Sequence, residues 1–265
     1  MTGTLRPAFI GGVALMLLGG LLLLRQLGIL PGPIPVGSLV VIGLGGLLIF
    51  SGRQGAMATR AVPHVPTAVV LDGASAARLV LNHGAGVLTV SAGAAPGRLV
   101  EGFVTGGVQQ KVMRVGDRLE VELRPDAEWQ RWPAEYRTLS WNLALGDGAA
   151  VDLVVNTGAS QVRLDLADLH LPSLKVQTGA SDVDITVPAH GECRTSVSAG
   201  AANIRIRVPE GVAAAVRNRS ALASFTIDQA RFPAVGDRFE SPGYADATDR
   251  ADIEIDGGVA SFSVD

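Results

Sequence analysis

The sequence lacks the residues from which many small domains build their stability and their chemistry. A single cysteine, Cys193, in a chain of 265 residues cannot form a disulfide framework or a cysteine-ligated metal cluster. Aromatic residues make up 5% of the chain, which excludes a large aromatic core. The 22 Lys and Arg residues are balanced by 25 Asp and Glu residues and form no basic tract. We therefore expect no nucleic-acid partner.

Motifs of catalysis are also missing. The sequence contains no Gly-x-Ser-x-Gly elbow and no phosphate-binding loop, and its four histidines are dispersed without metal-ligand spacing. Asp182 and Asp184 flank Val183 on one strand face, as a carboxylate pair would in a carbohydrate-cleaving β-helix. Because these positions recur once per repeat, an ordinary surface location explains them better. We predict that the chain is not an enzyme, with no catalytic residue, cofactor or metal ion.

A period of 21 residues is the strongest positive signal. Segments that begin at Asn156, Gln177 and Ser198 align without gaps, each as a glycine-containing corner followed by alternating apolar and polar residues. A fixed period in this range is typical of stacked repeats, and alternation with period two is typical of strands. The sequence therefore predicts an all-β soluble domain, a parallel β-solenoid with coils of about 21 residues.

Further copies are expected on either side of these coils. An earlier copy begins at Asn82, and another begins at Arg219, one period after Ser198, where we expect it to stack on the preceding coil. The copy from Asp256 ends the chain and is expected to be a capping strand. Over residues 71–123 the turn signals predict antiparallel hairpins that precede the solenoid.

Residues one coil apart fall into columns. Two apolar columns contain Val162, Val183 and Ile204, and Leu164, Ile185 and Ile206. Period-two alternation places these columns in the interior and directs Arg163, Asp184 and Arg205 outward, where alternating signs favour cross-strand pairs. Glycine at each corner is expected to supply a positive φ and to let neighbouring corners stack closely.

The N-terminal part has a different composition. Residues 7–24 and 34–50 are uncharged and apolar, each about long enough for a helix to cross a hydrocarbon core. A cleaved signal peptide is the alternative for the first run, but a second apolar run follows at once. We predict a transmembrane helical hairpin over residues 1–52, a tether over 53–66 and the β-solenoid domain over 67–265.

The charges beside the apolar runs indicate an orientation. Arg6, Arg53 and Arg60 lie on the side of the chain ends, and only Arg25 lies in the connector. The positive-inside rule then places the β-domain in the cytoplasm. The predicted localisation is multi-pass in the cell membrane, with the lipid bilayer as one partner.

An aromatic cluster supplies the candidate contact residues. All three tryptophans lie within residues 129–141, close to arginine and proline. The candidates for contact with a partner or with a membrane surface are Trp129, Arg131, Trp132, Tyr136 and Trp141. Such segments are typical of interaction patches, but large side chains also close the open end of a first coil. Both interpretations stay open at this point.

Several segments together carry a family resemblance. They are Leu-Gly-Ile-Leu at 27–30, Gly-Leu-Gly-Gly-Leu-Leu-Ile-Phe at 43–50, the strands at 81–90 and 99–102, and the Thr-Gly-Ala-Ser coils. With them the chain resembles the LiaF-like, cell wall-active antibiotics response proteins, whose β-part is called a toast-rack domain. The resemblance implies a regulatory membrane protein near a two-component sensor kinase, without an active site.

Two functions follow as expectations. The first is a membrane-anchored, non-catalytic regulator or scaffold in the cell-envelope stress response, whose solenoid binds a protein partner such as a membrane sensor kinase or a related membrane protein. The alternative is an outward-facing, adhesin-like module that binds a ligand or a polysaccharide. The repeat itself favours a rigid binding surface over an enzyme.

Overall fold

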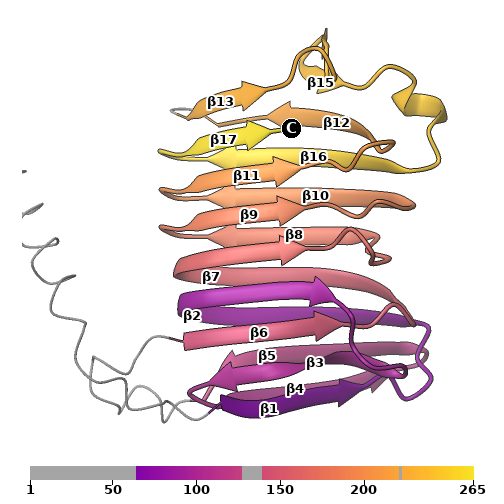
Figure 1. Ribbon diagram of the computed structural model, residues 1–265, viewed down its shortest axis with the longest axis vertical. Coiled ribbons are helices and arrows are strands. Elements are labelled where there is room, and N and C mark those ends of the chain that lie inside the picture. Colours follow the sequence, from indigo (N-terminus) through magenta and orange to yellow (C-terminus); the bar gives the residue numbers. More distant parts are fainter. Residues whose placement is uncertain (1–63, 127–138, 221–222) are drawn as a thin grey trace, which may run out of the picture. The chain divides into compact units, whose positions relative to one another are not determined.

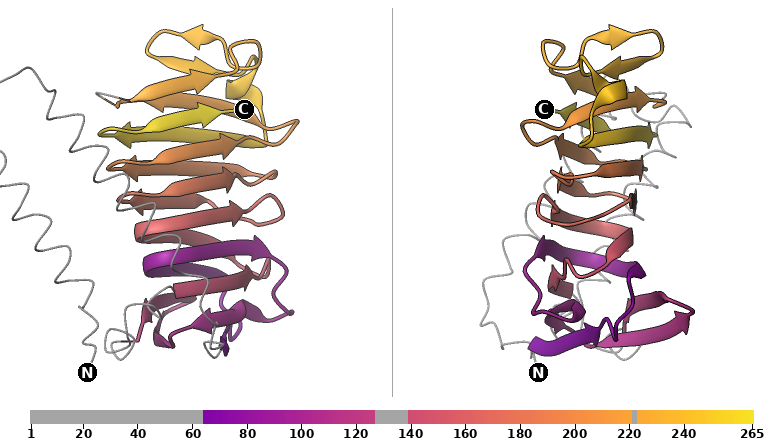
Figure 2. Two further views of the ribbon diagram at one scale, coloured as in Figure 1. Left: turned by 60° about the vertical axis from the view of Figure 1, so that its left-hand side comes forward. Right: turned by 90° about the vertical axis from the view of Figure 1, so that its right-hand side faces the viewer.

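The computed structural model describes residues 64–126, 139–220 and 223–265, and these residues form a β-solenoid (Figure 1). The chain divides into two compact units, residues 1–60 and 61–265, of which the first lies outside the described residues. In the second unit the strands stack along one axis, and each coil gives one strand to each of two facing sheets (Figure 2).

The strands are numbered in the order of the chain. The first seven are β1 (His64–Val70), β2 (Ala76–Ala92), β3 (Arg98–Thr105), β4 (Val108–Val115), β5 (Arg118–Pro125), β6 (Leu139–Leu145) and β7 (Ala150–Asp165). The next six are β8 (Ser173–Thr178), β9 (Asp182–Thr186), β10 (Glu192–Ala199), β11 (Asn203–Arg207), β12 (Ala213–Asn218) and β13 (Ser224–Ile227). The remaining elements are β14 (Ala234–Val235), β15 (Arg238–Glu240), the 3₁₀ turn η3 (Tyr244–Asp246), β16 (Arg250–Gly257) and β17 (Ser261–Val264).

The central coils confirm the 21-residue period. Strands β7, β8 and β10 pair in parallel in one sheet, and Leu153 lies beside Leu174. In the other sheet β7, β9 and β11 pair in parallel, and Val162 lies beside Val183, which lies beside Ile204. Residues one period apart are therefore neighbours in adjacent strands, as the apolar columns predict.

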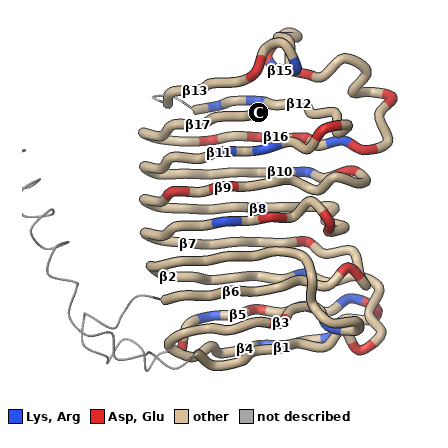
Figure 3. The backbone as a smooth tube through the Cα atoms, viewed as in Figure 1, with Lys and Arg blue, Asp and Glu red and all other residues tan. Residues whose placement is uncertain are grey.

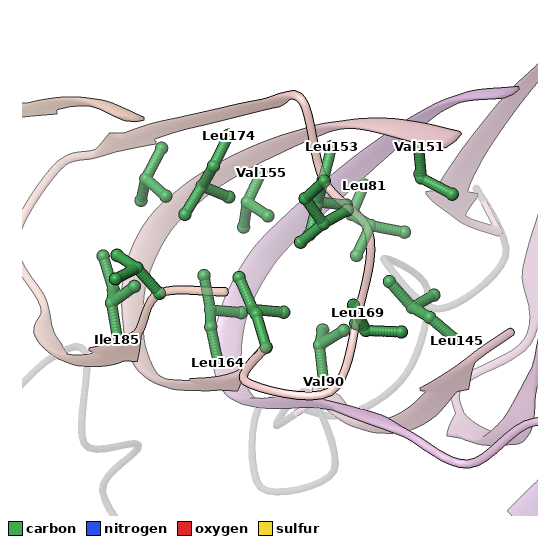
Figure 4. Packing of buried hydrophobic residues seen from close by; sticks show 14 of the residues in the cluster. Leu81, Val90, Leu145, Val151, Leu153, Val155, Leu164, Leu169, Leu174 and Ile185 are labelled. Carbon is green, nitrogen blue, oxygen red and sulfur yellow. The ribbon is translucent and has the colours of Figure 1, made fainter. Parts of the chain in front are cut away.

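The two sheets enclose a continuous apolar core. Leu153 and Leu174 from one sheet face Leu164 and Ile185 from the other, and all four side chains are buried (Figure 4). Removing an aliphatic side chain of this size from water contributes about 1.5–3 kcal/mol. Because the central coils repeat the same inward positions, each of them contributes apolar burial of this kind to the solenoid.

The glycine corners are explained by close approach and not by a positive φ. Gly158, Gly179, Gly200 and Gly258 are absent from the residues with positive φ. A Cβ atom added at Gly179 would lie 3.0 Å from the carbonyl oxygen of Gly158, and one added at Gly200 would lie 3.1 Å from that of Gly179. The corners also hydrogen-bond from coil to coil, since Ala180 N donates to Gly158 O at 3.1 Å. The expectation of a left-handed corner was wrong, and the close stacking of corners is confirmed.

The C-terminal strands are inserted into the stack and do not cap it. Strand β16 pairs in parallel with β10 on one side and with β12 on the other, and β17 lies between β11 and β13. Ile204 is therefore beside Phe262, and Phe262 is beside Phe225 (Figure 1). The expectation that the copy from Arg219 stacks directly on the coil before it was wrong.

A second insertion occurs near the other end. The long strand β2 turns a corner of the solenoid. It pairs in parallel with β5 over residues 76–81, with β6 over residues 86–92, and with β7 over residues 76–83 and 85–91. Antiparallel pairing is limited here to β1 with β3, β3 with β6, and β4 with β5. The predicted hairpins over 71–123 are thus partly wrong, because β2 is an internal strand of the solenoid.

The predicted fold class is corrected where it includes transmembrane helices. The secondary structure of the described residues is β-strand apart from one 3₁₀ turn, and among these residues no helix has the length and apolar character needed to cross a membrane. The predicted hairpin segments 7–24 and 34–50 lie outside the described residues. The two-helix transmembrane hairpin and the multi-pass membrane localisation are therefore not retained.

Candidate functional site

Exposed apolar side chains gather at the end of the solenoid that holds the antiparallel strands. Among the described residues, six of the nine large hydrophobic side chains that are exposed belong to three strands of this end. They are Val65 and Val70 on β1, Phe103 on β3, and Val112, Met113 and Val115 on β4. A concentration of exposed apolar side chains at one place marks an interaction surface, whereas single scattered ones do not.

A hollow of about 550 Å³ lies on the outer face of β1, β3 and β6. Phe103 projects from β3, with Pro66 of β1 and Asn142 of β6 beside it in the strand register. The next outward row is Ala68, Glu101 and Ala144. The two alanines are too short to fill the space on either side of Glu101, so the Phe103 ring stands at a hollow and is 57% exposed.

Glu101 is held in place at the edge of this hollow. Its carboxylate accepts a hydrogen bond from Arg98 Nη1 at 2.6 Å through Oε2 and one from the Ala95 backbone N–H at 2.7 Å through Oε1. The side chain is therefore held in one orientation. The hollow combines an aromatic surface with fixed charges of both signs, an arrangement suited to an apolar anchor surrounded by polar groups.

The close approach of β3 to β6 depends on a glycine. A Cβ atom added at Gly102 would lie 2.0 Å from the carbonyl oxygen of Asn142, so only glycine allows the strands this separation. The position faces the interior between Val100 and Val104, which are both buried. The floor of the hollow is thus a tightly built part of the sheet.

The other outward faces carry interspersed charges. Lys and Arg residues alternate with Asp and Glu residues along the described strands (Figure 3). Within one outward column Arg205 pairs with Asp184 at 3.8 Å, as the alternating signs predict. Asp182 accepts a hydrogen bond from Asn203 Nδ2 at 3.2 Å. These carboxylates belong to the charged surface ladder, and together with Arg163 they line a hollow of about 180 Å³ on the outer face of β7 and β9.

Trp141 is the only one of the candidate contact residues that lies in the described part of the chain. It belongs to β6 and is fully buried, with 0% of its surface exposed. Its ring packs edge-on against His83, with the ring centroids 5.4 Å apart. Trp129, Arg131, Trp132 and Tyr136 lie outside the described residues, and their contact role stays a prediction.

His83 and Ser160 form the most chemically suggestive pair, but they are shut off from solvent. His83 Nδ1 lies 3.3 Å from Ser160 Oγ, and the hydroxyl donates to the Gly84 carbonyl oxygen at 3.3 Å. Only 2% of His83 and 6% of Ser160 are exposed. A nucleophile must reach its substrate, so this pair is a structural contact at the corner between β2 and β7.

The burial of His83 makes the stability of the domain pH-dependent. Burial lowers the pKa of His83 from 6.5 to about 4, against a smaller opposing effect of the Leu139 backbone. The unfolded chain then binds more protons between these values, so stability falls as the pH drops from about 6.5 to about 4. The loss attributable to His83 is about 3 kcal/mol at full effect.

We expect urea unfolding at pH 7 and pH 4 to show this loss in the wild-type protein. The variant His83→Gln has no imidazole to titrate. The drop in its unfolding free energy from pH 7 to pH 4 should therefore be about 2–3 kcal/mol smaller than the drop in the wild-type protein. An equal change in both proteins would contradict a neutral, buried His83. His190, which is exposed, provides the matched control as His190→Gln.

Among the described residues, Cys193 and the possible metal ligands are the other groups to consider. Burial raises the pKa of the Cys193 thiol, whose Sγ lies 3.6 Å from Thr195 Oγ1. A buried thiol with a raised pKa is unreactive. Across residues 64–126, 139–220 and 223–265, no group of three or more His, Cys, Asp or Glu side chains is placed to hold a metal ion.

Residues 60–207 match the family model described as the N-terminal domain of toast_rack, also called DUF2154. The match covers more than half of the chain. The chain belongs to the toast_rack family. This confirms the toast-rack part of the resemblance, and the LiaF-like identity stays a prediction.

One solved structure shares the toast_rack fold of this chain over most of its length. It is a crystal structure of a protein from Clostridium sporogenes described as a "putative cell adhesion protein", with a TM-score of 0.67. The alignment covers 76% of this chain and 98% of that chain at 18% sequence identity. At this identity the likeness shows the fold alone. No curated protein matches the sequence.

The sequence analysis did not identify the Phe103 hollow, although the sequence contains one signal for it. In the toast_rack strand β3 the residues Val100 and Val104 point inward, so Phe103 falls at an outward position. A phenylalanine out of phase with the apolar alternation is therefore visible in the sequence. Its neighbours Pro66 and Asn142 come from distant segments, and their proximity could not be read from the spacing.

Proposed function

We propose that this toast_rack domain is a non-catalytic binding module that holds a protein partner at the Phe103 hollow. The carrying observation is the Phe103 ring, 57% exposed, at a hollow of about 550 Å³ on the outer face of β1, β3 and β6. An aromatic side chain that stands in a preformed hollow next to fixed polar groups is typical of a binding hot spot.

The partner class follows from the shape and chemistry of the hollow. An apolar side chain of a protein fits beside Phe103, and the Arg98–Glu101 pair can meet polar groups of the partner at the rim. Rigid strands position all of these groups, so little ordering is needed on binding. A sensor kinase, or a related membrane protein of the cell-envelope stress response, is the partner that we propose.

An adhesin-like module that binds a ligand or a polysaccharide is the second candidate. The structural likeness to the Clostridium sporogenes protein, which is described as a "putative cell adhesion protein", favours it. Under this alternative the hollow would accept a sugar ring against Phe103 and not a protein side chain. The two candidates differ in the chemical nature of the molecule found at Phe103.

Photo-crosslinking in cells can test the proposal. A benzophenone amino acid is placed at Phe103, and the same amino acid is placed at Thr226 as a matched control. Thr226 is exposed and lies at the opposite end of the same sheet. We expect a discrete protein adduct from position 103 and none from position 226. Equal adducts at both positions, or an adduct that a glycosidase removes and a protease leaves, would contradict a protein partner.

A further inference from the structure

Two hollows lie side by side on the outer face of one sheet. The Phe103 hollow ends at β6, where Asn142 lines it. The hollow of about 180 Å³ begins on β2, the next strand, where Thr89 lines it, and continues over β7 and β9. Asn142 and Thr89 are paired in the register of β2 with β6, so the two hollows meet at these side chains. Neither side chain has a hydrogen-bond partner among the described residues, so both can bond to a molecule that extends from one hollow into the other.

The strand register places side chains of both hollows in one row across the sheet. Phe103 of β3 lies beside Asn142 of β6, which lies beside Thr89 of β2. Thr89 in turn lies beside Arg163 of β7. All four side chains point outward, because the neighbours of each along its strand face the interior. Neighbouring strands are about 4.8 Å apart, so three strand intervals place Arg163 about 14 Å from Phe103.

Arg163 is the charged side chain of the second hollow that has no partner. The other two are Asp182, which accepts a hydrogen bond from Asn203, and Asp184, which pairs with Arg205 at 3.8 Å. Arg163 is exposed and has no hydrogen bond or ion pair within the described part of the chain. Its guanidinium presents a planar fork of N–H donors that matches a carboxylate. The group that this hollow still lacks is therefore an acidic one.

We propose that the partner held at Phe103 also places an acidic side chain on Arg163. This inference rests on the proposed function and specifies the segment of the partner that the outer face recognises. An extended chain rises about 3.4 Å per residue, so four residues span the distance from Phe103 to Arg163. Residues i, i+2 and i+4 of such a chain point to the same side. The segment then has an apolar residue over Phe103, a polar residue two positions on, near Asn142 and Thr89, and Asp or Glu four positions on.

The two contacts differ in their response to salt. Arg163 is exposed, so its attraction for a carboxylate is screened as the ionic strength rises. A charge at the rim of an interface changes the rate of association and its salt dependence. The apolar contact at Phe103 involves no charge and is not screened in this way. Salt therefore separates the contribution of Arg163 from that of Phe103.

The adduct from a benzophenone amino acid at position 103 provides the readout. Every variant of the full chain carries this amino acid, and crosslinking is carried out in cell extract at about 50 mM and about 500 mM salt. At the lower salt we expect Arg163→Gln to reduce the adduct yield by about fivefold and Arg163→Glu by at least about 10-fold. The yield from Arg163→Gln should also change little with salt. The matched control is Arg207→Glu, on β11 of the same outer face, which should leave the yield within about twofold.

The possible outcomes separate this inference from the proposed function. An undiminished adduct in both Arg163 variants would overturn the acidic contact and leave binding at Phe103 standing. Equal losses in Arg163→Glu and Arg207→Glu would also overturn it, because the effect would then belong to the charge of the whole face. No adduct from position 103 in the otherwise unchanged chain would contradict binding at Phe103 and, with it, this inference.

A second crosslinking position locates the acidic residue of the partner. Gln161 lines the second hollow two residues before Arg163, and a benzophenone amino acid there should label the same protein as position 103 does. Mass spectrometry should place the two labelled residues within about six residues of each other, with Asp or Glu in that interval. Labels on different proteins, or a labelled segment without Asp or Glu, would overturn the proposed contact.

Discussion

Deletion of residues 250–265 should abolish the cooperative fold of the C-terminal coils. These residues include β16 and β17, which lie between the coils of β10–β11 and β12–β13. The deletion removes buried Ile253, Ile255 and Phe262 and leaves the strands on both sides without partners. At about 1.5–3 kcal/mol for each buried side chain, the loss exceeds about 5 kcal/mol, comparable to the whole stability of a domain.

The measurement is urea or thermal unfolding followed by circular dichroism. We expect the truncated chain to lose its cooperative transition. A truncation that lowers the unfolding free energy by less than about 2 kcal/mol would contradict the inserted position of β16 and β17, because that is the effect of losing a peripheral cap.

A pair of point variants provides the matched control. Phe262→Ala removes a ring that is 2% exposed and should cost about 3–5 kcal/mol. Ile227→Ala lies on the outermost coil, where the side chain is only half-buried, and should cost clearly less. In a solenoid stacked in sequence order the ranking would be reversed, because the final strand would then be the outermost one.

Gly86→Ala should be among the most damaging single substitutions in the domain. The Cβ atom of alanine would lie 2.0 Å from the Leu139 carbonyl oxygen, where β2 begins its pairing with β6. Gly86 also has a φ of 137°, which alanine rarely adopts. Both strands must shift to relieve the contact, so we expect a loss of about 3 kcal/mol or more in the unfolding free energy.

The variant Gly93→Ala separates the effect of backbone strain from the effect of steric contact with a neighbouring strand. Gly93 has a φ of 113°, but a Cβ atom added there meets nothing within 4 Å. Its substitution should therefore cost only the backbone strain, about 1–2 kcal/mol. Urea unfolding of the two variants under the same conditions gives the comparison. Equal losses would show that backbone strain alone, and not the approach of β6, requires glycine at position 86.

The interior of the solenoid could be predicted because it is periodic. Inward residues such as Val162, Val183 and Ile204 stack on one another, so the column visible in the sequence is also a column in space. The spatial order of the coils could not be predicted in the same way. Copies of one repeat have similar faces, and similarity does not say which copy lies next to which.

The corner glycines report close stacking but not the order of the coils. A Cβ atom added at Gly200 would lie 3.1 Å from the Gly179 carbonyl oxygen, and one added at Gly258 would lie 3.0 Å from the Gly200 carbonyl oxygen. Gly258 thus packs on the coil of β10 and β11, although 58 residues separate it from Gly200. A glycine in the sequence does not say which earlier corner lies beneath it.

The binding surface was less accessible to sequence reasoning. Attention to rare aromatic residues selected Trp141, which is buried, while the exposed Phe103 lies in an otherwise regular strand. Its hollow is formed by β1, β3 and β6, which pair in antiparallel fashion outside the repeat. A non-repetitive site of this kind depends on tertiary contacts that no period in the sequence reports.

The most direct test of partner binding at the Phe103 hollow is the dissociation constant of the partner captured there. It should be measured by calorimetry for the wild-type chain, for Phe103→Ser and for Val259→Ser, which removes an apolar side chain of similar exposure from a distant corner. We expect Phe103→Ser to weaken binding by about 10- to 30-fold, as loss of a hot-spot aromatic does, and Val259→Ser to leave it unchanged. Equal affinities for Phe103→Ser and the wild-type chain would contradict binding at the hollow.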